Sequence, residues 1–72
     1  MARYTAWMTV IDGVEKKHRS ENATYTWLRD QAGELPDGTK VSVFVQEEGR
    51  KDHWYTFERL VVLDGRTVEV RA

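Results

Sequence analysis

Alternation of apolar and polar side chains marks three long stretches of the chain as strands. Residues 39–46 place Val41, Val43 and Val45 on one face, and residues 54–63 also alternate, although a polar pair interrupts them at Glu58-Arg59. Successive side chains of a strand point to opposite faces. The pattern therefore predicts strands over 39–46 and 54–63, the second with a bend or bulge near its polar pair.

The first stretch, residues 4–11, carries large apolar residues on both of its faces, with Met8 and Val10 on one and Trp7 and Ile11 on the other. A strand that is apolar on both faces tends to be central in a sheet, or to have one face covered by a helix and the other by a partner. Residues 4–11 are therefore predicted to form a strand of one of these two kinds.

Two Asp-Gly pairs predict tight hairpins near the ends of the chain. Asp12-Gly13 and Asp64-Gly65 each lie between β-prone runs. Type I′ turns need positive φ at both central residues, which Asp and Gly tolerate. The first turn should lead into a polar strand over residues 14–19, where lysines protect an exposed sheet edge. The second should lead into a last strand around Val68 and Val70.

A helix is predicted over residues 23–32, which contain neither Gly nor Pro. Ser20 and Asn22 are both candidate N-caps, and Gly33 is a candidate stop. Tyr25, Leu28 and Ala32 form the stripe that should face the core, whereas Thr24 should face water. The order of elements is then ββαβββ, a single α+β domain over residues 1–72 with one helix packed on an antiparallel sheet.

Composition narrows the classes of function. The chain of 72 residues has no cysteine and a net charge of -1. A general nucleic-acid binder is usually plainly basic, so the charge argues against that class. No apolar run approaches the ~18 residues of a membrane span. We therefore expect a cytoplasmic protein without a disulfide.

The residues that carry chemistry are sparse. The two serines lack a nucleophile-elbow motif, and His18 and His53 have no partner at a metal-ligand spacing. The glycines form no phosphate-binding motif. We therefore expect a non-enzymatic protein with no cofactor and no metal.

Aromatic residues instead indicate a protein-interaction module. The chain has three Trp, three Tyr and two Phe, more than one core layer easily hides. Part of Trp7, Phe44 and Trp54 should remain on the uncovered sheet face, where exposed aromatics mark contact sites. This face could serve self-association or another protein, and both remain open. Size and composition resemble those of small phage or mobile-element accessory proteins that modulate another protein.

The most specific contact region predicted is Gly49 to Arg59. Tyr55 and Phe57 share one face and are predicted to form a core pair, which leaves Trp54 as the surface anchor. The neighbouring residues Arg50, Lys51 and His53 should line the same contact. Cations beside aromatics are also typical of single-stranded nucleic-acid binding. Nucleic-acid binding through residues 50–55 is therefore the alternative function.

Overall fold

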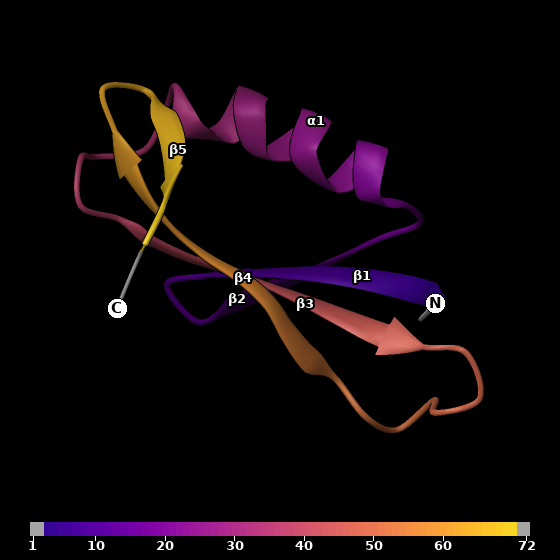
Figure 1. Cartoon of the computed structure of the whole chain (residues 1–72). Coiled ribbons are helices and arrows are strands. Elements are labelled where there is room, and N and C mark those ends of the chain that lie inside the picture. The colour runs from indigo at the N-terminus through magenta and orange to yellow at the C-terminus, as the bar shows by residue number, and fades with distance from the viewer. Residues whose placement is uncertain (1–2, 71–72) are drawn as a thin grey trace.

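One helix lies on one face of a five-stranded antiparallel sheet, in the order that the sequence predicts (Figure 1). This computed structural model describes residues 3–70. The elements are β1 (Tyr4–Ile11), β2 (Val14–His18), α1 (Glu21–Ala32), β3 (Lys40–Glu47), β4 (Tyr55–Leu63) and β5 (Arg66–Glu69). The strand order is β2-β1-β3-β4-β5. The α+β fold is thus confirmed, with β1 inside the sheet and the lysine-rich β2 at one edge.

Both Asp-Gly pairs form the predicted turns. The φ angles are 51° at Asp12 and 78° at Gly13, and 55° at Asp64 and 74° at Gly65. Positive φ at both central residues is the mark of a type I′ turn, whose twist matches that of the flanking strands. The second turn is also held from outside, because the amide of Asp64 donates to Asp37 Oδ1 at 2.9 Å.

The helix begins where a serine caps it. Ser20 is in an extended conformation, and its hydroxyl accepts a hydrogen bond from the Ala23 amide at 3.0 Å. The helix therefore starts at Glu21, two residues before the predicted range. At the other end Gly33 has φ -65°, in the right-handed region. Gly33 thus does not stop the helix by a left-handed conformation, and the chain leaves through a turn in which the Glu34 amide donates to Gln31 O at 2.9 Å.

The core lies between α1 and the inner strands. Leu28 and Ala32 are buried as predicted, and Tyr25 packs at the margin of the core. The expectation that Thr24 faces water is wrong, because its side chain is fully buried. Its hydroxyl donates to Ser20 O at 2.7 Å, so burial leaves no polar atom unpaired. The sheet contributes Trp7, Val41, Val43, Val45, Leu60 and Val62 to the same core.

A bulge interrupts the pairing of β3 with β4. Val43 is opposite Glu58, whereas the next residue, Phe44, is opposite Thr56. Phe57 is therefore the extra residue, one position before the polar pair at which the sequence predicts an irregularity. The bulge brings the Phe57 ring against Trp7, with ring centroids 4.8 Å apart.

These backbone angles predict opposite effects for two Gly→Ala substitutions. Gly65→Ala should destabilise the protein by about 1–2 kcal/mol, because a Cβ strains the left-handed conformation. A Cβ at Gly65 would meet no atom closer than 3.8 Å, so the cost comes from φ and not from a clash. Gly33→Ala should be neutral or stabilise by about 0.4–1 kcal/mol, because Ala restricts the unfolded chain. Urea unfolding of both variants measures the difference, and equal effects would contradict the assigned turn.

Candidate functional site

The sheet face opposite α1 is not covered by any other helix or strand of residues 3–70 (Figure 1). Residues paired across neighbouring strands point to the same face. The pairs Met8–Phe44, Val10–Ser42 and Val61–Val68 place these side chains on the uncovered side. We name the following set the open-face patch: Met8, Val10, Lys17, Lys40, Ser42, Phe44, Arg59, Val61, Val68 and Val70.

The centre of the open-face patch is apolar. Met8 is only 6% exposed, although no second layer of secondary structure lies over it among the described residues. It is flanked by Lys17 on β2 and Phe44 on β3, which its register places on either side. Phe44 is half-buried. Met8 and Phe44 therefore form the apolar centre of the patch, and its most exposed apolar side chains, Val68 and Val70, lie on the side of β5.

A shallow groove of about 500 Å³ lies at the β4 side of the open-face patch. Lys40, Ser42, Arg59, Val61 and Val70 contribute to its lining. The amide of Val70 donates to Arg59 O at 2.9 Å, which fixes the end of the described chain beside β4. The groove thus has apolar side chains together with two cations, Lys40 and Arg59.

Trp7 and Phe44 lie on opposite sides of the sheet. The sequence groups Trp7 with Phe44 and Trp54 as a candidate for the uncovered face, but Trp7 is 4% exposed and belongs to the core under α1. The reason is alternation: Trp7 is paired with Val45, which also faces the core, whereas its neighbour Met8 is paired with Phe44. Trp7 is therefore not accessible to a partner in this structure.

The other predicted contact residues lie in the loop between β3 and β4. Arg50, Lys51 and His53 are exposed and, with Gly49 and Asp52, line a hollow of about 350 Å³. Arg50 Nη1 donates to Tyr55 Oη at 3.0 Å, and this bond raises the pKa of Arg50. Gln46 Nε2 donates to Lys51 O and holds the loop to β3. Trp54 is half-buried immediately before β4.

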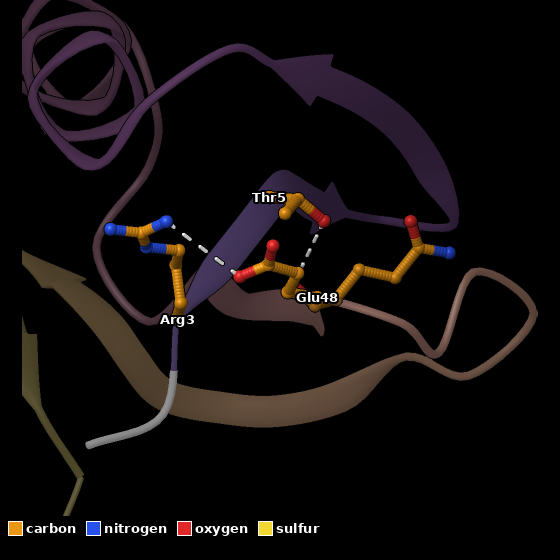
Figure 2. A network of polar contacts seen from close by, with 4 residues as sticks. Arg3, Thr5 and Glu48 are labelled. Atoms are coloured by element: carbon orange, nitrogen blue, oxygen red, sulfur yellow. Dashed lines mark hydrogen bonds and ion pairs between the residues drawn. The ribbon is translucent and has the colours of Figure 1, made fainter.

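Acidic residues accompany this loop. Figure 2 shows Glu48 beside Arg3, where β1 begins and β3 ends, with Arg3 Nη1 at 3.8 Å from Glu48 Oε2. Both side chains are exposed, so this ion pair contributes little to stability. The amide of Glu48 also donates to Arg3 O at 2.8 Å, which continues the pairing of the two strands. The loop therefore carries charges of both signs.

Tyr55 and Phe57 differ in burial. Tyr55 packs against the core as predicted, but Phe57 is 40% exposed, so the expectation of a buried Phe57 is wrong. The bulge is the physical reason, since it displaces Phe57 from the alternation of β4. Phe57 instead covers Trp7 from outside, and Tyr4 meets it edge to face at 5.7 Å.

One half-buried tyrosine links the helix to this bulge. Tyr25 Oη donates to Glu58 Oε1 at 2.5 Å. Burial and this bond raise the pKa of Tyr25, because both disfavour the phenolate. The contact ties α1 to β4 and leaves Tyr25 neutral across the physiological range.

His18 lies at the end of β2 against the helix. Its Nε2 lies 3.0 Å from the hydroxyl of the buried Thr9, and its ring centroid is 5.1 Å from that of Trp27. Burial, with a smaller contribution from Lys16, lowers the pKa of His18. This arrangement is structural, because it joins β1, β2 and α1.

Within residues 3–70, no group of three His, Cys, Asp or Glu side chains could hold a metal ion. The same residues contain no helix that is long and apolar enough to cross a bilayer. Comparison of the chain with protein-family models, curated proteins and solved structures found no significant match.

Phe44 is the one residue of the open-face patch that the sequence analysis names as a candidate for contact with a partner. Alternation in β1 places Met8 and Trp7 on opposite faces of the sheet, but the sequence does not indicate which of these faces the helix covers.

Truncation of two contacting aromatics should have unequal effects. Trp7→Ala should lose about 3–5 kcal/mol, because it removes a large side chain from the core. Phe57→Ala should cost clearly less, because Phe57 is 40% exposed and lies outside Trp7. Chemical denaturation of the two variants measures both losses. A larger loss for Phe57→Ala would show that the bulge is assigned to the wrong residue.

The environment of His18 predicts loss of stability in mild acid. Its folded-state pKa is lowered from 6.5, so the unfolded chain binds the proton more readily than the folded chain. Unfolding free energy should therefore fall as pH drops from 6.5 through the lowered folded pKa. His18→Gln should flatten this slope, and His53→Gln, in the exposed loop, should retain it. Denaturation midpoints across this range measure the slope, and an unchanged slope in His18→Gln would contradict the assignment.

Proposed function

We propose that this protein is a non-enzymatic interaction module that binds another protein through the open-face patch. The supporting observation is an apolar sheet face with the partly exposed Phe44 and the exposed Val68 and Val70, which no helix or strand of residues 3–70 covers. Contiguous apolar surface on a folded domain usually marks a contact site. The partly exposed aromatic Phe44 near the centre of this face is the type of side chain that contributes most to interface energetics.

Single-stranded nucleic-acid binding through residues 50–55 is the weaker candidate. The Arg50 guanidinium is engaged with the Tyr55 hydroxyl, and the His53 ring lies 5.6 Å from the Tyr55 ring. Asp52 lines the same hollow as Arg50 and would repel phosphate. The roles of Arg50, Lys51, His53 and Trp54 in partner binding remain predictions.

Selection from a displayed library of random peptides tests the proposal before any natural partner is identified. The wild-type protein should enrich peptides that bind about tenfold or more weakly to Phe44→Asp, because a charge at the centre of the apolar patch opposes burial. Fluorescence anisotropy with the enriched peptides measures the affinities.

The matched control is Val14→Asp, which adds the same charge at a residue that is 69% exposed on β2 and outside the open-face patch. This variant should bind the enriched peptides as the wild type does. Circular dichroism should show both variants folded. Failure to enrich any peptide, or peptides that bind Phe44→Asp undiminished, would reject the open-face patch as the contact surface.

A further inference from the structure

We propose that the open-face patch selects an acidic, apolar segment of another protein and rejects a second copy of this chain. The inference rests on the proposed function and adds to it the chemistry of the partner. It depends on how charges are distributed between this face and the rest of the surface.

The open-face patch is basic in a chain that is slightly acidic. Lys17, Lys40 and Arg59 belong to it, and Glu15, paired with Val10, is the acidic strand residue that the register places on the same side. The whole chain has 11 Lys and Arg against 12 Asp and Glu. Most of the other carboxylates lie on the helix, in turns and loops, or, like Glu58 and Glu69, on the helix side of a strand. None of the three cations forms an ion pair within 4.0 Å among residues 3–70, so each is available to a partner.

The positions of the cations define what fits between them. Lys40 and Arg59 line the groove together with Val61 and Val70, and Lys17 flanks Met8 at the opposite side of the patch. Apolar side chains of a partner would cover the valines and Phe44, while its carboxylates would meet the cations at the rim. Complementary charge around an apolar centre steers encounter and fixes register. An acidic segment with interspersed apolar residues meets both requirements.

A second copy of this chain, packed through its own open-face patch, does not meet these two requirements. Two-fold packing would place two open faces of net positive charge against each other, because each carries Lys17, Lys40 and Arg59 against the single strand carboxylate Glu15. Like charges juxtaposed across an interface oppose association. The apolar centre alone would favour such a dimer, and the charge pattern opposes it.

Single-stranded nucleic acid shares the negative charge but matches the centre of the patch less well. Single-stranded nucleic acids bind through aromatic platforms. Among the residues assigned to the patch, Phe44 is the single aromatic, and the others that form its apolar surface are Met8, Val10, Val61, Val68 and Val70. Aliphatic side chains at this density favour contact with protein side chains.

Three fluorescein-labelled synthetic peptides test the charge preference. They share the same leucine positions, and their remaining positions are all glutamate, all glutamine or all lysine. Anisotropy at low salt should show the glutamate peptide bound about tenfold more tightly than the glutamine peptide, with the lysine peptide weakest. High salt should reduce the difference, because ions screen exposed charges.

Charge reversal within and outside the patch identifies the cause. The double variant Lys40→Glu/Arg59→Glu should lose the preference for glutamate or invert it. The matched control Lys16→Glu/Arg29→Glu changes the net charge equally, at exposed residues of β2 and α1 outside the open-face patch, and should keep the preference. Equal behaviour of the two double variants would overturn the inference.

The remaining outcomes separate this inference from the proposed function. Glutamine and glutamate peptides that bind equally, and that both lose affinity for Phe44→Asp, would overturn the charge preference and leave the interaction module standing. No binding that depends on Phe44 would reject both. A wild-type dimer in sedimentation velocity that Phe44→Asp dissociates would also overturn the inference, as would tighter binding to oligothymidylate or to phosphatidylserine vesicles.

Discussion

The structure depends on one short helix that can cover only one side of its sheet. Helix α1 packs against the five-stranded sheet, and its buried side chains Leu28 and Ala32 lie in the same core layer as Val43 and Val62. A chain of this size has little apolar surface to bury and a thin margin of stability. The second sheet face therefore receives no layer from residues 3–70, although β1 places Met8 there. One face of the sheet is buried and the other is exposed because the described chain has only one helix to cover the sheet.

The pairing of the strands decides which side chains lie on the uncovered face of the sheet. Alternation in β1 sends Trp7 under the helix and Met8 to the uncovered face, and the register with β3 then places Phe44 beside Met8. The bulge at Phe57 changes the alternation of β4, so that Tyr55 and Leu60 both face the core while Arg59 faces the groove. The exposure of an aromatic side chain therefore depends on strand register and on the bulge: Trp7 is 4% exposed, and Phe57 is 40% exposed.

Polar side chains differ in their surroundings on the two sides of the sheet. On the helix side, the half-buried Tyr25 bonds to Glu58, and His18 bonds to Thr9. On the uncovered side, Lys40 and Arg59 have no acidic partner among the described residues and lie beside apolar side chains. The internal hydrogen bonds join α1 to the sheet, whereas the two cations of the uncovered side have apolar side chains as neighbours.

The sequence by itself determined the order of elements, the two type I′ turns and the place of β2 at an edge, because these depend on local preference: Asp-Gly accepts positive φ, Ser20 caps a helix, and lysines suit an exposed strand. It did not determine which face of the sheet the helix covers, the burial of Thr24 or the exposure of Phe57. Alternation divides side chains into two sets but does not say which set is the inner one. Only the packing of α1 made that choice, and the bulge in β4 depends on register with β3, a contact between segments distant in the chain.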